Sequence, residues 1–255
     1  MERGAATGGG RRWTVPIPSS LIHYFTCLLS PIVYFSNFKV PLFDLAFCYF
    51  SNFRSFICLL NGTFLVYIKR KLEGKVALIT GGASGIGECS AKLFAEHGAK
   101  IVIADIQDQL DHAICEPIGL SNSIYIHCDV ANEEDVKNTV DIAVTTFGKL
   151  NIMFNNAGIL DFYKERIIDN EKTDFERELS VNITCVFVGM KHAARVMVPA
   201  RAGSIISTAS VASNIGGMAT HAYTCAKHVV TGLTKNLAVE LGQFGIRVNC
   251  LSPYQ

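Results

Sequence analysis

Two residues four positions apart, Tyr223 and Lys227, have the side chains needed to move a proton. If this stretch is helical, both lie on one face of the helix. A phenol is a poor acid or base at neutral pH, with a pKa of roughly 10, but an adjacent ammonium favours the phenolate and lowers that pKa. The tyrosine could then exchange a proton with a substrate alcohol or carbonyl. Ser210, thirteen residues before Tyr223, could hydrogen-bond to the same substrate oxygen. Alone, such a Tyr and Lys usually form a solvated helix pair, so the assignment depends on the rest of the sequence.

A glycine-rich segment upstream predicts a site for a dinucleotide. Residues 80–87 (TGGASGIG) follow an apolar run and precede a helical pattern. In such a turn Gly81 makes the bend, Gly85 lets the backbone approach a pyrophosphate, and Gly87 lets the helix pack closely. The phosphates would then meet free N–H groups at the start of the helix. The plain alternative is a structural turn. The candidate phosphate-binding residues are Gly81, Ser84, Gly85, Ile86 and Gly87.

Asp105 ends the next apolar run, 18 residues after Gly87. A carboxylate at that position can accept hydrogen bonds from both hydroxyls of an adenine ribose. It would also repel a 2′-phosphate, and the sequence places no Arg or Lys next to it. We therefore predict NAD as the cofactor, with NADP less favoured. The alternative is an ordinary aspartate in the turn after a strand.

These residues fall within a regular alternation of strand and helix patterns. Short apolar runs ending in turn residues are typical of buried parallel strands, and the longer segments between them are typical of helices. We predict an α/β fold, a doubly wound parallel sheet of the Rossmann type with six strands. The predicted strands are 75–80, 100–105, 123–128, 150–155, 203–208 and 245–251. The predicted helices are 85–97, 133–147 (between a cap at Asn132 and a stop at Gly148), 173–197 and 221–242.

Composition limits the partners. With 23 basic and 22 acidic side chains in 255 residues, the net charge of +1 gives no support for a nucleic-acid partner. The nine cysteines are scattered and odd in number, so we interpret them as free thiols, which favours a reducing compartment and a cytoplasmic location. No metal site is predicted.

The first seventy residues differ from the rest. They hold nine of the 16 phenylalanines, and their apolar runs, 21–35, 40–50 and 56–68, are shorter than the roughly 18 to 20 residues of a membrane-spanning helix. Neither a helical nor a strand period holds through them, so neither an amphipathic helix nor a surface strand is expected. Three interpretations compete: a membrane anchor using residues 21–68, a targeting segment, and a non-native extension without function, which we favour. We thus expect residues 1–70 to be an extension and 71–255 a dinucleotide-binding domain.

Residues 72–254, which contain these motifs, resemble the classical short-chain dehydrogenase/reductase family. Their motifs are similar to those of its plant secoisolariciresinol dehydrogenase-like group. The segments that carry the resemblance are 203–210 (GSIISTAS), 223–228 (YTCAKH) and 245–254 (GIRVNCLSPY). The resemblance implies a homo-oligomer and a small hydrophobic alcohol or ketone as substrate.

The resemblance also implies roles for individual residues. Asn182 would hold a proton-relay water, Ser210 would orient the carbonyl, Tyr223 would be the general acid/base, and Lys227 would bind the nicotinamide ribose and lower the pKa of the tyrosine. Further cofactor contacts would come from Asp129, Val130, Asn156, Ala157 and Gly158.

The chain departs from the family pattern at its end. The family continues beyond the turn at 252–254 with a substrate-covering segment, a helix and a seventh strand, which supply much of the substrate pocket and one subunit interface. We therefore expect a truncated chain whose loops 159–172 and 214–220 line one side of the pocket. The favoured function is NAD-dependent interconversion of a secondary alcohol and a ketone. The alternative is an inactive, truncated or membrane-tethered remnant that at most binds a dinucleotide.

Overall fold

The computed structural model describes residues 56–60, 63–67, 71–164 and 166–253, and the chain divides into two compact units, Met1–Tyr67 and Ile68–Gln255. In the first unit, β1 (Phe56–Leu60) and β2 (Thr63–Tyr67) form an antiparallel pair, with Phe56 opposite Tyr67. The sequence pattern indicated no surface strand in this segment and so missed this antiparallel pair. Nearly every position of both strands is apolar, so no alternation marks them. The overlooked signal is the dipeptide Asn61-Gly62 between the strands, which is typical of a hairpin connection.

The other predictions for residues 1–70 (an anchor, a targeting segment or a functionless extension) concern residues that lie almost entirely outside the described part of the chain.

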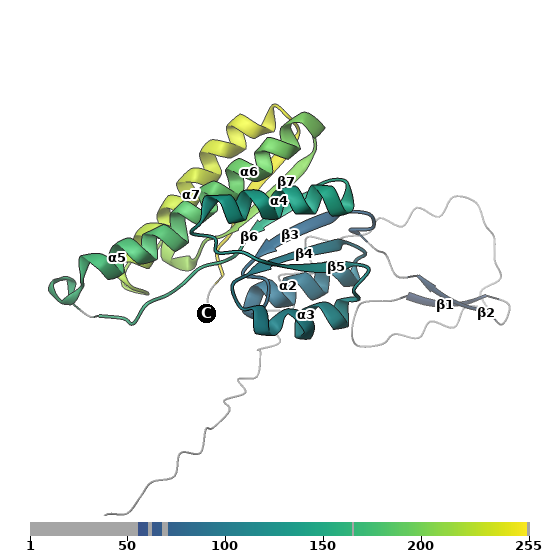
Figure 1. Cartoon of the computed structure of the whole chain (residues 1–255), viewed down its shortest axis with the longest axis horizontal. Helices are drawn as coiled ribbons and strands as arrows, with labels where there is room; N and C mark the ends of the chain where they lie inside the picture. Colours follow the sequence, from purple (N-terminus) through teal and green to yellow (C-terminus); the bar gives the residue numbers. More distant parts are fainter. Residues whose placement is uncertain (1–55, 61–62, 68–70, 165, 254–255) are drawn as a thin grey trace, which may run out of the picture. The chain divides into compact units, whose positions relative to one another are not determined.

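The second unit is built on a six-stranded parallel sheet, which confirms the predicted fold class (Figure 1). Its strands, in spatial order, are β5 (Ser123–His127), β4 (Lys100–Asp105), β3 (Val76–Thr80), β6 (Ile152–Asn155), β7 (Gly203–Thr208) and β8 (Ile246–Leu251). The chain moves outward from β3 to β5 and then returns to β6 on the other side of β3. Ligands of such sheets bind at this reversal, outside the carboxyl ends of the strands.

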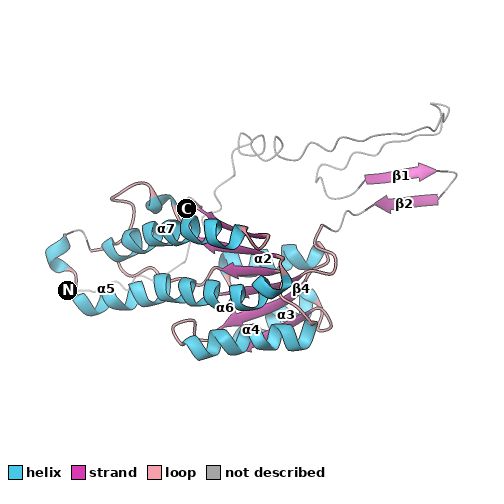
Figure 2. Ribbon diagram, turned by 90° about the horizontal axis from the view of Figure 1, so that it is seen from above, coloured by secondary structure: helices cyan, strands magenta, loops and turns pink. Residues whose placement is uncertain are grey.

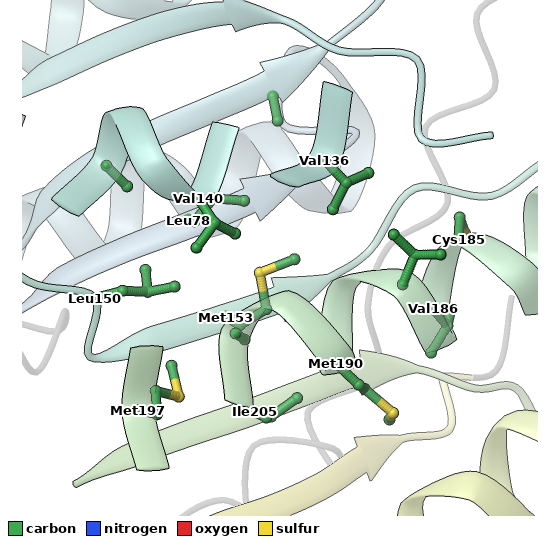
Figure 3. Close-up of a cluster of buried hydrophobic side chains, with 14 of the residues drawn as sticks. Leu78, Val136, Val140, Leu150, Met153, Cys185, Val186, Met190, Met197 and Ile205 are labelled. Carbon is green, nitrogen blue, oxygen red and sulfur yellow. The ribbon is translucent and has the colours of Figure 1, made fainter. Parts of the chain in front are cut away.

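Helices cover the sheet on both faces (Figures 1 and 2). On one side α2 (Gly85–Glu96) and α3 (Asp111–Ile118) pack on β3, β4 and β5. On the other, α4 (Glu133–Phe147), α6 (Cys185–Ala200) and α7 (His221–Gly242) share a larger core with alternate residues of the strands. Figure 3 shows part of this core, where Met153 of β6 lies among side chains of α4 and α6. Neighbouring strand residues point to opposite faces, so Leu78 belongs to this core and Ile79 to the smaller one.

The predicted helix 173–197 is not a single α-helix. It consists of α5 (Lys172–Leu179), a π-helical stretch η3 (Ser180–Thr184) and α6. Short π-helical insertions often mark functional sites, because the extra residue redirects the side chains around it. The prediction also missed α3 and three single turns, η1 (Asp108–Leu110), η2 (Ile167–Asp169) and η4 (Val211–Ser213). These elements are too short for a period to appear in the sequence.

Among the described residues, one helical stretch, Lys172–Ala200, has the length and apolar composition of a membrane-crossing helix. Half of its most apolar window is buried inside the α/β unit, as in the core helix of many folded proteins.

Candidate active site

Two positions of the glycine-rich turn favour glycine, Gly87 because of close packing and Gly85 because of its backbone conformation. A Cβ atom on Gly87 would lie 2.0 Å from the carbonyl oxygen of Gly81, so the first turn of α2 touches the backbone of the loop. Gly85 has a φ of +56°, which favours glycine, and a Cβ there would meet nothing within 4 Å. The loop is thus tight on its inner side and open at Gly85. This geometry leaves room for a phosphate beside the free N–H groups at the start of α2.

Thr80 and Asn156 fasten this turn to the ends of the neighbouring strands. The Thr80 hydroxyl accepts hydrogen bonds from the backbone N–H groups of Asn156 (3.0 Å) and Ala157 (3.1 Å). The Asn156 amide donates to the carbonyl oxygens of Thr80 and Gly81, both at 3.2 Å, and accepts from the Thr208 hydroxyl at 3.2 Å. One side chain therefore ties together the ends of β3, β6 and β7, which stabilises the floor of the site.

Asp105, only 5% exposed, is held against the same turn. One carboxylate oxygen accepts a hydrogen bond from the Ala83 N–H at 3.0 Å. The other accepts from the backbone and side-chain N–H groups of Gln107, at 3.1 and 3.2 Å. Sequence reasoning missed Gln107, whose side chain also reaches the Ser84 hydroxyl (3.5 Å). The acidic group, the open glycine and the helix start together form a set of donors and acceptors that fits an adenine dinucleotide.

Asp129 and Val130 follow β5 at the same edge of the sheet. The Cys128 N–H donates to the backbone carbonyl of Asp105 at 3.0 Å, which ties the two strand ends together. The Asp129 side chain is engaged locally, accepting from the Ala131 N–H at 2.9 Å. The structure thus places both residues next to the end of the Asp105 strand.

Tyr223 and Lys227 lie on α7, and Ser210 lies at the end of β7, so the three predicted catalytic residues share the carboxyl edge of the sheet. The Lys227 Nζ atom is 5.2 Å from the centre of the Tyr223 ring and donates a hydrogen bond to the Thr208 carbonyl at 2.7 Å. Ser210 caps η4 by accepting from the Ala212 N–H at 3.1 Å.

Ser213, which the sequence analysis missed, connects Ser210 to Lys227 by hydrogen bonds. Its hydroxyl accepts from the Ser210 N–H at 3.3 Å and donates to the Lys227 carbonyl at 2.9 Å. The serine pair three residues apart after a strand forms a capping box, and that spacing was the available signal.

The protonation of this group differs in one respect from the expectation. Burial raises the pKa of Tyr223, interaction with the Ser210 side chain lowers it, and the charge of Glu178 raises it further. Lys227, which was predicted to lower the pKa of Tyr223, is not among the groups that shift this pKa. The ammonium lies 5.2 Å from the ring centre and donates a hydrogen bond to the Thr208 carbonyl, and among the described residues no hydrogen bond joins it to the phenol oxygen.

Lys227 itself is only 3% exposed, and burial lowers its pKa, while the Cys185 and Glu178 groups oppose that shift.

Asn182 is fully buried in the π-helical stretch η3, and its side chain forms hydrogen bonds with the backbone of the loop after β6. Its side-chain oxygen accepts from the Ile159 N–H at 3.0 Å, and its amide donates to the Ile159 carbonyl at 2.7 Å. A Cβ atom on Gly158 would lie 2.8 Å from the Asn182 oxygen and 3.7 Å from the Lys227 Nζ atom. The Asn182 side chain, Gly158 and the Lys227 Nζ atom therefore lie next to one another.

Within the described residues, no group of three or more His, Cys, Asp or Glu side chains could hold a metal ion.

A parallel sheet with these residues at its carboxyl edge defines a class of protein, a dinucleotide-dependent oxidoreductase with a tyrosine–lysine pair. Comparisons with known proteins support this class. A family model described as enoyl-(acyl carrier protein) reductase matches residues 81–255. A solved structure of a short-chain type dehydrogenase/reductase from Mycobacterium marinum is similar, with a TM-score of 0.69 and 35% identity, over 72% of this chain and 76% of that one.

Several plant enzymes are similar in sequence. Secoisolariciresinol dehydrogenase of Forsythia intermedia is 70% identical over 190 residues, which cover 74% of this chain and 69% of the relative. Momilactone A synthase of Oryza sativa subsp. japonica is 59% identical over 72% of this chain and 67% of the relative. Borneol dehydrogenase, mitochondrial, of Lavandula x intermedia is 57% identical over 73% and 71%. The chain belongs to the short-chain dehydrogenase/reductase family, whose members are NAD(P)-dependent oxidoreductases.

Proposed function

We propose that this protein interconverts a secondary alcohol and a ketone with NAD as the cofactor and Tyr223 as the general acid/base. The observation that carries the proposal is the buried Lys227 beside the half-buried Tyr223, 5.2 Å from Nζ to ring centre, at the sheet edge that also bears the glycine turn. A lysine is almost never fully buried unless it is paired, because removing its charge from water is costly.

In this proposal each side chain has a separate task. Bound nicotinamide supplies the acceptor or donor of a hydride at the carbinol carbon. Tyr223 takes the proton from the substrate oxygen in alcohol oxidation and gives it back in ketone reduction. The Ser210 hydroxyl orients that oxygen by a hydrogen bond. Lys227 binds the nicotinamide ribose and keeps a positive charge beside the phenol ring. Asn182 fixes the backbone at Ile159 and holds a water on the proton path.

We propose that the cofactor lies along the glycine turn. Gly81, Ser84, Gly85, Ile86 and Gly87 would hold the pyrophosphate. Asp105 would accept hydrogen bonds from the adenine ribose, with its orientation fixed by Ala83 and Gln107. The remaining contacts would come from Asp129, Val130, Asn156, Ala157 and Gly158. A carboxylate at the ribose supports NAD over NADP, since it would repel a 2′-phosphate.

The proposed substrate is a hydrophobic, ring-bearing alcohol or ketone. The loop after β6 exposes large apolar side chains, with Phe162 95% exposed, and a second loop exposes Ile215 and Met218. The names of two relatives, secoisolariciresinol dehydrogenase and borneol dehydrogenase, support an alcohol as the substrate class. The alternative of an inactive remnant gains no support from the described residues, which hold the complete group of Ser210, Tyr223 and Lys227.

For the chain as a whole, we propose that residues 71–255 are the dinucleotide-binding domain and that residues 1–70 are an extension. We also propose a homo-oligomer in the cytoplasm. The cysteines of the described residues support a reducing compartment, since Cys89, Cys115, Cys128, Cys185, Cys225 and Cys250 are all free thiols.

The test is the variant Tyr223→Phe, assayed in the full chain with NAD and a panel of secondary alcohols that includes borneol. Turnover should fall by at least about a thousandfold, because the phenol hydroxyl belongs to the chemical step. The dissociation constant for NADH should stay within a few fold of the unchanged chain. A large loss of NADH affinity, or full turnover by the variant, would contradict the assignment.

A further inference from the structure

Glu178 is a buried carboxyl group next to the proposed catalytic helix, and no predicted role accounts for it. It lies near the end of α5 and is only 1% exposed. Acidic side chains are almost never fully buried unless they are paired, because burial penalises the charged form. In the part of the chain that the structure describes, no cation forms an ion pair with Glu178. Its partner is instead a hydroxyl group on α7.

That hydroxyl connects Glu178 to the residue that carries the chemistry. The Thr220 Oγ1 atom donates to the Glu178 carboxylate, with 2.9 and 3.1 Å to its two oxygens. As the N-cap of α7, the same oxygen accepts a hydrogen bond from the Tyr223 N–H at 3.1 Å. A carboxylate, a hydroxyl and a backbone amide thus form a short chain that ends at Tyr223. The start of a helix also favours a negative charge, which stabilises the carboxylate there.

The charged groups around Glu178 are few. On its own helix Arg177 is turned toward Asp161, with which it makes two hydrogen bonds of 2.7 and 2.8 Å. From α7 the neighbouring titratable groups are Tyr223 and Lys227, whose pKa values the Glu178 charge raises. The pKa of Glu178 itself is raised by burial and by the charge of Asp161, and lowered by the Thr220 hydrogen bond and by Arg177.

We propose that Glu178 is a positioning residue for Tyr223: its carboxylate fixes the first turn of α7 through Thr220, and its negative charge holds the proton on the phenol. The inference rests on the proposed function in that Tyr223 is taken as the general acid/base. In the direction of alcohol oxidation the phenol must lose its proton, so the charge of Glu178 places that loss at higher pH. The same charge stabilises the Lys227 ammonium, so the lysine stays protonated when the tyrosine reacts.

The variant Glu178→Gln separates charge from structure. The amide oxygen of glutamine can still accept the Thr220 hydrogen bond, but the negative charge is gone. The ionisation of Tyr223 should then move to lower pH, and the acid limb of the pH–rate profile for alcohol oxidation should move in the same direction. The matched control is Glu176→Gln on the same helix, since Glu176 is solvent-exposed and paired with Lys172. It should leave both curves unchanged.

The measurement is NMR of isotope-labelled tyrosine in the full chain, with the Tyr223 signal assigned by its loss in Tyr223→Phe. It reads ionisation directly and needs no turnover. An unchanged Tyr223 titration in Glu178→Gln would therefore overturn the inference, whereas a Tyr223→Phe variant with full turnover would overturn the proposed function instead.

If Glu178→Gln does not fold, the same NMR titration of the unmodified chain tests the inference. The Tyr223 signal should then show a second inflection at low pH that coincides with the titration of the Glu178 carboxyl carbon. A Tyr223 signal that is flat through that titration would overturn the inference.

Discussion

At the scale of single residues, Asp105 illustrates how one side chain can serve both structure and selectivity. Both of its oxygens already accept hydrogen bonds from backbone groups, one from Ala83 in the cofactor loop and the other from Gln107 just after β4. A carboxylate oxygen has two acceptor sites, so a ribose hydroxyl can still bind, or can replace the Gln107 side chain. Removing the carboxylate should therefore weaken the binding of both NADH and NADPH and change the preference between them.

We expect Asp105→Ala to reduce the preference for NADH over NADPH by about tenfold or more, equivalent to at least about 1.4 kcal/mol. The reason is that the repulsion of the 2′-phosphate disappears, although both affinities fall as the loop loosens. Calorimetric titration of the two nucleotides gives the ratio. The control is Asp108→Ala, which removes a nearby exposed carboxylate that contacts His127. If the ratio in Asp105→Ala matches that of the unchanged chain, selectivity lies elsewhere.

Lys227 carries a cost in stability that a substitution should reveal. Burial lowers its pKa below 10.5, so the unfolded chain binds more protons than the folded chain between the two pKa values. The cost is complete below the folded-state pKa and disappears as the pH rises past 10.5. Lys227→Met should therefore raise the free energy of unfolding at neutral pH by roughly 1 kcal/mol, with no turnover, as is common for active-site substitutions.

Urea unfolding of Lys227→Met over a range of pH tests this expectation, and the gain should shrink as the pH approaches 10.5. Lys235→Met, at an exposed position of the same helix, should change the stability little at any pH. A Lys227→Met chain that is less stable than the parent at neutral pH would show that the hydrogen bond to Thr208 outweighs the cost of burial.

At the scale of elements, α2 makes a very close contact with the glycine turn. A Cβ on Gly87 would lie 2.0 Å from the Gly81 carbonyl oxygen, so Gly87→Ala must push the helix away from the loop. We expect a loss of about 1–3 kcal/mol in unfolding free energy and a fall of at least about tenfold in NADH affinity.

Gly232→Ala is the matched control for Gly87→Ala, because it lies within α7 and a Cβ there meets nothing within 4 Å. It should stabilise the chain by roughly 0.5–1 kcal/mol, since alanine loses less backbone freedom in a helix. Thermal unfolding and calorimetry measure both effects. Equal behaviour of the two variants would mean that the turn and α2 do not need their close contact.

The sequence predicted the elements whose signals are local. Strands such as β3 and β4 are continuous apolar runs buried on both faces, and the glycines between them mark where each ends. The π-helical stretch η3 was not predictable, because its residues look like those of a continuous helix and only its backbone hydrogen-bond pattern distinguishes it. The hairpin β1–β2 was missed because its strands do not alternate.

The candidate site divides in the same way. The glycine turn, Asp105, Ser210, Tyr223 and Lys227 were found by residue type and spacing. Glu178 could not be found, because its burial depends on the packing of α5 against Thr220, 42 residues away along the chain. Likewise Gln107 and Ser213 act through contacts between segments, and neither residue type is unusual in a loop.

At the scale of the whole molecule, the two units differ in what they contribute to the proposed site. The unit Ile68–Gln255 contains the sheet, both cores and all the proposed site residues. The unit Met1–Tyr67 contributes the hairpin β1–β2 among its described residues. We propose that the sheet edge of Ile68–Gln255 holds one dinucleotide next to a proton-transferring tyrosine.

The most direct measurement is a calorimetric titration of NADH, and then of NADPH, into the full chain, with circular dichroism to show that it is folded. We expect saturable binding with one NADH per chain, and weaker binding of NADPH. A folded chain that binds neither nucleotide would contradict this proposal, because the glycine turn and Asp105 would then be a structural turn without a cofactor.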